Sequence, residues 1–262
     1  MKKFLLNILA VFSVTAGALV WADDKPAVTG TFDVVFIGDS ITAGSGLPDP
    51  KTQAAPVIAG ADLQKELGDG AAVYISNRGH SGHTTVDFQP GGKDFSGVES
   101  AAKDLEAAHP GQLVFSIMIG TNDSANAGPK GAPVSAADYG HNLQLIIDAL
   151  LAEFPDAKFV IHHATWYSPN THNTSDYEGD SAANRLKSYF PAIDSLVAHY
   201  ASSNPGHVFL GDVKAYDYFE NHTEEMRAEN GKDGVFHLHP NATGAQSLAG
   251  FWATALAEKL RQ

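Results

Sequence analysis

The feature that most constrains the fold is an alternation of short apolar runs with longer stretches of helical spacing. The apolar runs are FDVVFIG (32–38), AAVYIS (71–76), QLVFSIMIG (112–120), KFVIHHATW (158–166) and HVFLGD (207–212). The helical stretches cover residues 54–67, 96–109, 135–154 and 242–260. Because strands separated by helices pair in parallel through right-handed crossovers, the sequence predicts an α/β fold, a three-layer α/β/α sandwich with a central parallel sheet. Residues 166–206 are less regular, and we expect them to lie over one edge of the sheet.

The first 22 residues have the pattern of a secretory signal peptide. A short basic start, MKK, precedes an apolar segment at 4–20, and the small-x-small triplet that ends at Ala22 fits a cleavage site. A membrane anchor is the alternative, but the segment is short for a span and acidic residues follow it directly. We therefore expect residues 1–22 to be a cleaved signal peptide and residues 23–262 to form a single domain. The mature protein is then secreted or periplasmic.

Composition excludes several kinds of partner and linkage. The chain has no cysteine, which excludes disulfides and a lipid-anchored cysteine. Its formal net charge is -13, and loss of Lys2 and Lys3 with the signal peptide takes it to -15. Because nucleic-acid binding depends on neutralising phosphates, nucleic acid is not expected as a partner, and an anionic membrane surface is disfavoured for the same reason. A neutral or weakly charged substrate fits this charge better.

Three of the predicted strands end in small polar clusters that could form one site. The clusters are GDS at 38–40, NRGHSG at 77–82 and GTND at 120–123. Each alone is also an ordinary turn sequence, because Gly, Asp, Asn and Ser are common turn residues. In a parallel sheet, however, successive strand ends lie along one edge, where ligands usually bind. We therefore expect the three clusters to converge.

The converging residues have the chemistry of nucleophilic catalysis. Ser40 is the candidate nucleophile, and a serine needs a base within hydrogen-bond reach. The backbone N–H of Gly79 and the side-chain amide of Asn122 can donate to a developing oxyanion, with the Ser40 N–H as a third donor. The candidate bases are His237 and His239, in the segment before the C-terminal helix.

Four motifs carry a family resemblance over nearly the whole mature chain. They are GDSIT at 38–42, N-x-G-x-S-G-x-T-T at 77–85, GTND at 120–123 and HPNATG at 239–244. In this order they resemble the four sequence blocks of the SGNH hydrolase superfamily, also called GDSL esterases. The resemblance implies a flavodoxin-like sheet and ester hydrolysis through an acyl-enzyme, without metal or organic cofactor. It implies Ser40 as nucleophile, Gly79 and Asn122 as oxyanion donors, and His239 as general base, the histidine followed by a glycine (Gly244) five residues later.

The acid that orients the histidine is the one departure from the family pattern. In the family an acidic residue usually stands three positions before the catalytic histidine, and here Phe236 occupies that position. Asp233 lies nearby and is the candidate carboxylate, reaching His239 through a bulged loop. A backbone carbonyl is the alternative partner, and it too could fix the imidazole tautomer.

The narrower resemblance is to secreted bacterial sialate and other carbohydrate O-acetylesterases. The loop at 165–177 places Trp166 and Tyr167 among hydroxyls and amides, which suits a sugar ring but also an ordinary polar surface loop. Arg78 and Arg185 are candidate partners for a sialic acid carboxylate. We therefore expect removal of O-acetyl groups from a glycan. The alternatives are a short-chain acyl or lipid esterase such as a lysophospholipase, and a sugar-binding protein that has lost catalysis.

Histidine pairs raise the question of a metal. His80 with His83 and the adjacent His162 and His163 are the candidates, but side chains adjacent on a strand point to opposite faces. The chain has neither an H-E-x-x-H motif nor any cysteine. The sequence therefore predicts no metal site. The G-H-S-G stretch at 79–82 is not a nucleophile elbow, because His83 stands where a second glycine is required.

Overall fold

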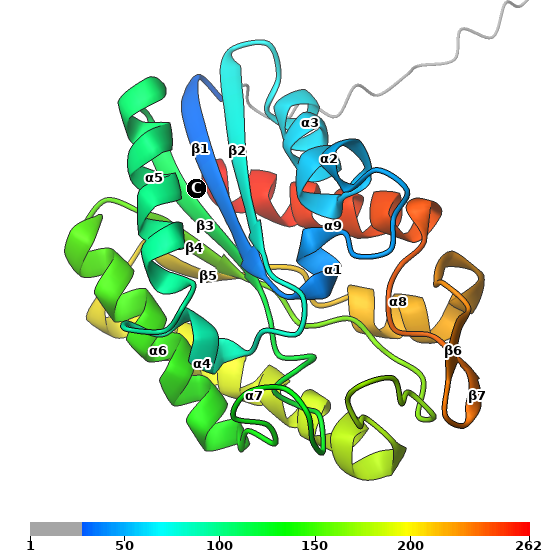
Figure 1. The fold of residues 1–262 in the computed structure, drawn as a ribbon. Coiled ribbons are helices and arrows are strands. Elements are labelled where there is room, and N and C mark those ends of the chain that lie inside the picture. Colours follow the sequence, from blue (N-terminus) through cyan, green and yellow to red (C-terminus); the bar gives the residue numbers. More distant parts are fainter. Residues whose placement is uncertain (1–27) are drawn as a thin grey trace, which may run out of the picture.

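The computed structural model describes residues 28–262, so the predicted signal peptide lies outside the described residues. Within that range, no helix is long and apolar enough to cross a membrane. The described chain folds around one five-stranded sheet with helices on both faces (Figure 1).

The central sheet is parallel throughout and has the strand order β2-β1-β3-β4-β5. Its strands are β1 (Gly30–Gly38), β2 (Ala71–Gly79), β3 (Gln112–Met118), β4 (Lys158–Ile161) and β5 (Val208–Leu210). This confirms the predicted α/β sandwich. Gly38 pairs with Gly79 on one side and with Met118 on the other, so the first three strands end level with one another. That shared edge carries the three polar clusters.

The helices divide between the two faces of the sheet (Figure 1). One face carries α3 (Ala55–Leu67) and α9 (Ala242–Leu260), with the short α2 (Pro50–Gln53) beside them. The other face carries α5 (Phe95–Ala108), α6 (Ala136–Glu153) and α7 (Gly179–Ser203). At the carboxyl edge lie α1 (Ser40–Ala43), α4 (Thr85–Phe88), α8 (Ala215–Asn221) and a 3-10 turn at Thr223–Glu225.

Strand β1 shows why the apolar runs form a buried sheet. Its Val35 and Ile37 pack into the core beneath α5, α6 and α7, whereas Val34 and Phe36 pack into the core beneath α3 and α9. Because successive side chains point to opposite faces, a strand covered on both faces is a continuous apolar run. Burying each such side chain stabilises the fold by about 1.5–3 kcal/mol.

The prediction of irregular structure over residues 166–206 is wrong for most of that segment. Helix α7 covers Gly179–Ser203, and its buried residues recur at helical spacing: Ala182, Leu186, Tyr189, Ile193, Leu196 and Tyr200. Pro191 lies inside this helix, where it removes one hydrogen bond and usually interrupts a helix. The buried stripe outweighs that cost. The predicted strand at 158–166 is also shorter, because β4 ends at Ile161.

A small hairpin, which the strand pattern did not predict, stands beside the carboxyl edge of the sheet. It consists of β6 (Glu229–Gly231) and β7 (Gly234–Phe236), paired in antiparallel fashion. The hairpin leads directly into the segment before α9, and Figure 1 shows it next to the start of that helix. This placement matters for the site, because the segment contains both candidate histidines.

Candidate active site

Ser40 is held at the point where β1 turns into α1. Asp39 caps that helix, and its Oδ1 accepts the N–H of Ile41 at 3.0 Å. Gly38 is required at the strand end, because a Cβ there would lie 2.1 Å from Thr42 Oγ1 and 2.3 Å from the Met118 carbonyl oxygen. Burial raises the pKa of Asp39 to about 6 although the Ile41 N–H opposes it. Asp39 therefore shapes the turn that presents Ser40.

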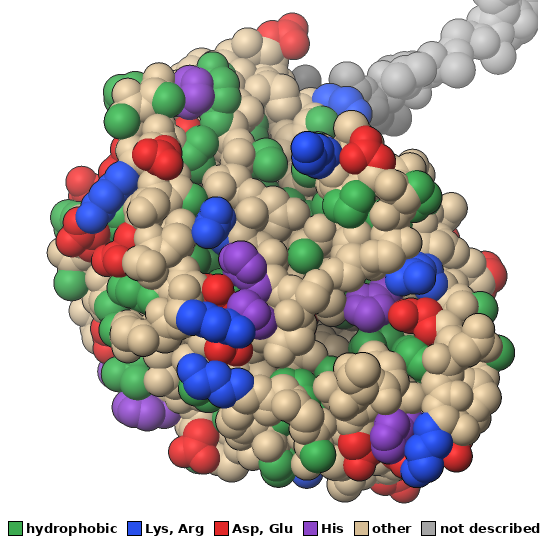
Figure 2. Space-filling view, in the orientation of Figure 1, with side chains coloured by type: hydrophobic (Ala, Val, Ile, Leu, Met, Phe, Trp, Pro, Cys, Tyr) green, Lys and Arg blue, Asp and Glu red, His purple; other side chains and the backbone are tan. Residues whose placement is uncertain are grey.

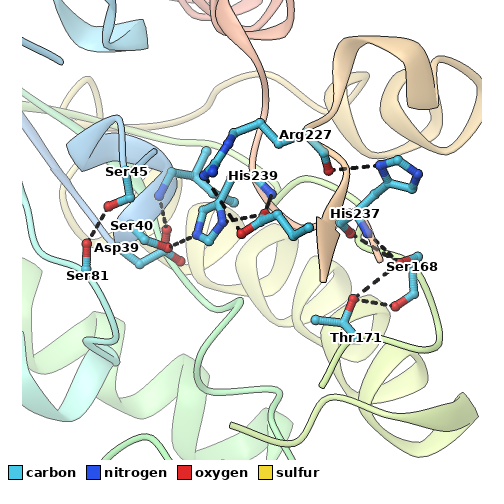
Figure 3. Close-up of polar contacts among 11 residues, drawn as sticks. Asp39, Ser40, Ser45, Ser81, Ser168, Thr171, Arg227, His237 and His239 are labelled. Carbon is cyan, nitrogen blue, oxygen red and sulfur yellow. Dashed lines mark hydrogen bonds and ion pairs between the residues drawn. The ribbon is translucent and has the colours of Figure 1, made fainter. Parts of the chain in front are cut away.

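The structure brings Ser40 and His239 into direct contact. His239 Nε2 lies 2.8 Å from Ser40 Oγ, although the two residues are 199 positions apart in the chain (Figure 3). Asn241 caps α9 by accepting the N–H groups of Thr243 and Gly244, which fixes where the helix starts. His239 is thus anchored two residues before a helix cap, with its ring turned to the serine.

The carboxylate that contacts His239 is Glu229, and the candidate Asp233 is wrong. Glu229 Oε1 lies 2.8 Å from His239 Nδ1 and also accepts the His239 backbone N–H at 3.2 Å. In the hairpin register Glu229 pairs with Phe236. The acid therefore lies on β6, directly across the hairpin from position 236 on β7, where the family pattern has it. Asp233 lies at the hairpin tip, where its carbonyl accepts from Asn170.

Glu229 is tuned to stay ionised beside the imidazole. Burial raises its pKa, but the hydrogen bond from His239 and the charges of His239 and Arg227 together lower it below its ordinary value. Arg227 Nη1 lies 3.8 Å from the second carboxylate oxygen. The backbone N–H of Arg227 donates to the His239 carbonyl at 2.8 Å. Serine, histidine and glutamate therefore form a continuous hydrogen-bonded chain.

His237, the other candidate base, forms hydrogen bonds with Arg227 and Ser168 and does not contact Ser40. Its Nδ1 lies 3.0 Å from the Arg227 carbonyl oxygen, and its backbone N–H donates to Ser168 Oγ at 2.8 Å (Figure 3). The Ser168 N–H returns a hydrogen bond to the His237 carbonyl at 2.9 Å. These bonds hold the hairpin against the loop after β4, and they point the His237 ring away from Ser40.

Asn122 is buried in the turn after β3 with its amide orientation fixed. Its Nδ2 donates to the His83 carbonyl at 2.8 Å, and its Oδ1 accepts the Tyr177 hydroxyl at 2.5 Å. Burial raises the pKa of Tyr177 well above its usual range, so the hydroxyl remains a donor. The second amide hydrogen of Asn122 is then free to point into the cavity that the residue lines.

The glycine that faces the site is Gly82 rather than Gly79. The Gly79 N–H donates to Asn77 Oδ1 at 2.9 Å, and a Cβ on Gly79 would lie 2.3 Å from the Ala43 nitrogen. Gly79 therefore packs against α1. Gly82, in the left-handed region at φ +78, lines the cavity. Within residues 28–262, the N–H groups of Gly82 and Ser40 donate to no other residue.

A cavity of about 300 Å³ opens above Ser40, and Figure 2 shows a hollow on this face. Its lining is mostly hydroxyls and amides: Ser40, Ser45, Ser81, Gly82, Asn122, Asn173, Thr174, Ser175, Tyr177, Leu238 and His239. The apolar hollow behind His239, bounded by Ile41, Leu47 and Leu248, has only about 10 Å³ of space. The site therefore has room for a small acyl group but offers little apolar surface for a long chain.

The residues expected to bind a sugar lie differently from the prediction. Tyr167 is buried with its hydroxyl 2.9 Å from Ser124 Oγ, and Trp166 packs against the cores on both faces of the sheet. Arg185 donates to the Ser124 carbonyl at 2.5 Å, and Arg78 lines a groove between β2 and α5. None of the four lines the cavity above Ser40. The same loop instead contributes Asn173, Thr174 and Ser175.

Sequence reasoning missed Glu229, Gly82 and Tyr177. A signal existed for Glu229, because glycines at 231 and 234 flank a two-residue turn, which is a hairpin pattern. Gly82 and Gly79 belong to the same motif, and only the path of the backbone separates them. Tyr177 joins the site through tertiary contact with Asn122, for which the sequence has no local signal.

This arrangement can carry out acyl transfer. His239 can take the Ser40 proton while Glu229 stabilises the resulting imidazolium. The N–H groups of Ser40 and Gly82 and the amide of Asn122 can stabilise negative charge on a carbonyl oxygen. The described residues around Ser40 thus have the contacts that acyl transfer through a serine requires.

The comparisons with known proteins agree with this geometry. Residues 36–247 match the family model described as the GDSL-like Lipase/Acylhydrolase family. That range contains Ser40, Asn122, Glu229 and His239. No curated protein matched the chain.

Solved structures share the fold at low sequence identity. A carbohydrate acetylesterase from Sinorhizobium meliloti is 18% identical, with a TM-score of 0.57 and coverage of 86% of this chain and 98% of the other. A carbohydrate esterase of family 3 from Talaromyces cellulolyticus is 18% identical, with a TM-score of 0.55 over 87% and 98% of the two chains. An aryl esterase from M. smegmatis is 19% identical, with a TM-score of 0.55 over 87% and 98%. These likenesses show the fold.

Proposed function

The chain belongs to the GDSL-like lipase/acylhydrolase family, and we propose that within it the protein is an esterase that removes O-acetyl groups from a carbohydrate. The family makes it a serine ester hydrolase. The observation that carries the finer assignment is the small polar cavity above Ser40. Carbohydrate acetylesterases among the structures that share the fold support the same assignment.

In the proposed reaction, Ser40 Oγ attacks the ester carbonyl while His239 Nε2 takes its proton. The oxyanion accepts hydrogen bonds from the N–H groups of Ser40 and Gly82 and from the Asn122 amide. The tetrahedral intermediate collapses, the sugar oxygen leaves with the proton from His239, and acetyl remains on Ser40. Water, deprotonated by His239, then attacks the acyl-enzyme, and the second intermediate releases acetate while His239 returns the proton to Ser40 Oγ.

The lack of apolar space beside His239 supports an acetyl ester over a long acyl ester. A lipase needs an apolar groove for its acyl chain, and the apolar space next to His239 is filled by Ile41, Leu47 and Leu248. Each methylene that finds no apolar surface forfeits about 0.8 kcal/mol of burial. Longer chains therefore gain no binding energy here, which disfavours the lipid-esterase alternative.

The chemistry of the cavity wall supports a polyhydroxylated alcohol. Asn173, Thr174 and Ser175 present amide and hydroxyl groups that can exchange hydrogen bonds with sugar hydroxyls. Neither Arg78 nor Arg185 lines the cavity, so the structure offers neither as a partner for a sialic acid carboxylate. We therefore favour a neutral acetylated glycan, with acetylated sialic acid as the comparison substrate.

The test is a substrate series with acetate release as the readout. Acetylated xylan fragments, acetylated sialic acid and nitrophenyl esters of two to twelve carbons are compared by kcat/KM. We expect kcat/KM to be no higher for octanoyl than for acetyl esters, since the additional methylenes find no apolar surface here. We also expect an acetylated neutral glycan to exceed nitrophenyl acetate in kcat/KM. A rise in kcat/KM with chain length would overturn the acetyl assignment.

The matched controls separate the serine from its neighbours. Ser40→Ala is expected to abolish acetate release, whereas Ser45→Ala, in the same cavity wall, keeps the nucleophile. Wild-type turnover by the Ser40→Ala protein would show that the reaction occurs elsewhere.

Export is tested separately: amino-terminal sequencing of the mature protein is expected to begin at Asp23.

A further inference from the structure

Two histidines and an aspartate that take no part in the proposed reaction lie together beside the site. His80 and His83 belong to the loop after β2, and Asp94 immediately precedes α5. A ring nitrogen of each histidine and a carboxylate oxygen of Asp94 lie within 4.8 Å of one another. Figure 2 shows histidine side chains gathered with acidic and basic ones on the face that carries the hollow. The sequence alone had no reason to join position 94 to the histidine pair.

The geometry of the three groups fits a single small cation. The ring centroids of His80 and His83 are 5.2 Å apart with planes inclined by 14°. Two imidazoles on a tetrahedral zinc ion, with zinc–nitrogen bonds of about 2.0 Å, have ring centres about 5 Å apart. His80 Nε2 lies 3.8 Å from Asp94 Oδ1. His83 Nδ1 is hydrogen-bonded to Asp94 Oδ2, and this contact has to open to admit an ion between the two atoms. A movement of about half an ångström brings the His80 pair to the spacing of about 3.3 Å in such a site.

The neighbouring lysines pair with another carboxylate, so they do not neutralise Asp94. Two lysines are close, but Lys93 and Lys130 lie 3.7 Å and 3.6 Å from Asp87 Oδ1. Within residues 28–262, Asp94 forms ion pairs with His80 and His83 alone. Asp94 is itself buried.

We propose that His80, His83 and Asp94 form a binding site for a divalent transition-metal ion, with zinc as the best fit. Nitrogen and carboxylate ligands in this number suit zinc, and His80 is exposed enough to leave a fourth position open to water. The binding of an ion at these residues stands independently of the proposed function, whereas a positioning role for these residues rests on it.

The site is joined to the oxyanion donors through its own backbone. The His83 carbonyl accepts the Asn122 amide at 2.8 Å, and Gly82 is the residue before it. An ion that holds both histidine rings also holds the loop between them, Ser81 and Gly82. The three ligands are therefore positioning residues for the oxyanion donors, and the metal takes no part in the acyl-transfer step.

A second cluster in the chain provides a matched control. His172, Glu178 and Asp233 also place three ligand atoms within 4.8 Å of one another. There Lys232 Nζ lies 3.9 Å from Glu178, and Asp233 is exposed, so an ammonium already neutralises the carboxylates. Substituting His172 removes a histidine from a cluster of the same size without touching the proposed site.

The experiment is titration of the untagged, metal-stripped protein with cobalt(II) and zinc(II). We expect one ion per chain, visible ligand-field bands of tetrahedral cobalt, and a rise in Tm with zinc concentration. His80→Ala and Asp94→Asn are expected to weaken binding at least about 100-fold, because even partners that only orient ligands cost 10–100-fold. His172→Ala is expected to bind like the wild type. Circular dichroism establishes that each variant is folded.

Three results would overturn the proposal. They are no binding by the folded wild-type protein, unchanged binding in His80→Ala, and loss of binding in His172→Ala. A separate readout tests the positioning role: zinc should change kcat for acetyl esters in the wild type and not in His80→Ala. Metal binding that leaves kcat unchanged in both proteins would retain the site and remove its link to the oxyanion donors.

Discussion

Replacing Glu229 with glutamine is the sharpest test of how the site works. Glutamine keeps the size of the side chain but removes the charge 2.8 Å from His239 Nδ1. Two unit charges about 4 Å apart at an effective dielectric constant of about 20 interact by about 4 kcal/mol. Arg227, 3.8 Å from the other carboxylate oxygen, competes for part of that interaction. We therefore expect a loss of about 3 kcal/mol in transition-state stabilisation, or roughly 100-fold in kcat.

The pH dependence of the variant distinguishes an electrostatic role from a structural one. The assay is kcat and KM for nitrophenyl acetate from pH 4 to pH 10, with burst kinetics to follow acyl-enzyme formation. The depressed pKa of Glu229 keeps it ionised in the native protein, so its contribution is present above its unfolded-state pKa and is lost as pH falls through the lower native value. In Glu229→Gln this dependence on the Glu229 carboxylate should disappear. KM should change little.

The control is Asp233→Asn at the hairpin tip, four residues along the chain from Glu229. Spacing along the sequence favours Asp233, whereas the hydrogen bonds favour Glu229. We expect Asp233→Asn to stay within about twofold of the wild type, as exposed charges contribute little. The reasoning fails if Glu229→Gln retains more than a tenth of wild-type kcat. It fails equally if Asp233→Asn loses as much as Glu229→Gln.

Two further predictions concern the oxyanion turn and its buried acid. Asn122→Ala should lower kcat by about 10²–10³-fold with little change in KM, and Tyr177→Phe, which removes the bond that orients the amide, should give a smaller loss; equal losses would contradict this order. Burial raises the pKa of Asp123 to about 7 although the Thr85 side chain and N–H donate to it, so the native state retains a proton that the unfolded chain has lost. The free energy of unfolding should therefore fall as pH rises from about 4 to 7, by up to about 1.4 kcal/mol per pH unit, and urea titrations of Asp123→Asn should show a flatter dependence.

How far the sequence could predict the fold depended on which residues carry a local signal. Strand β1 and helix α9 follow from apolar periodicity alone, because each buries its own regular pattern. Helix α7 has an equally regular buried stripe, but Pro191 lies inside it, and proline usually interrupts a helix. There tertiary burial outweighed the local penalty, which residue preferences cannot weigh.

The site residues likewise divide into those with a local sequence signal and those without one. Ser40 and Asn122 follow strands whose ends are level, so topology alone predicted that they converge. The choice between Gly79 and Gly82 depended on the path of the two residues between them, which the sequence does not show. His239 was separable from His237 only through a family spacing, and the structure distinguishes them by the partner of each ring, Ser40 or the Arg227 carbonyl.

The origin of the orienting acid shows why spacing along the chain can mislead where pairing across strands does not. In the hairpin, Glu229 is level with Phe236, so a carboxylate on either strand could lie near the same imidazole. With the acid on β6, position 236 is free to carry a phenyl ring, and Phe236 is buried in the core beneath α5, α6 and α7. The Arg227 N–H and the His239 N–H then tie the two strands' extensions together around the acid. The register that places Glu229 on His239 is therefore fixed by the core side chain on the opposite strand.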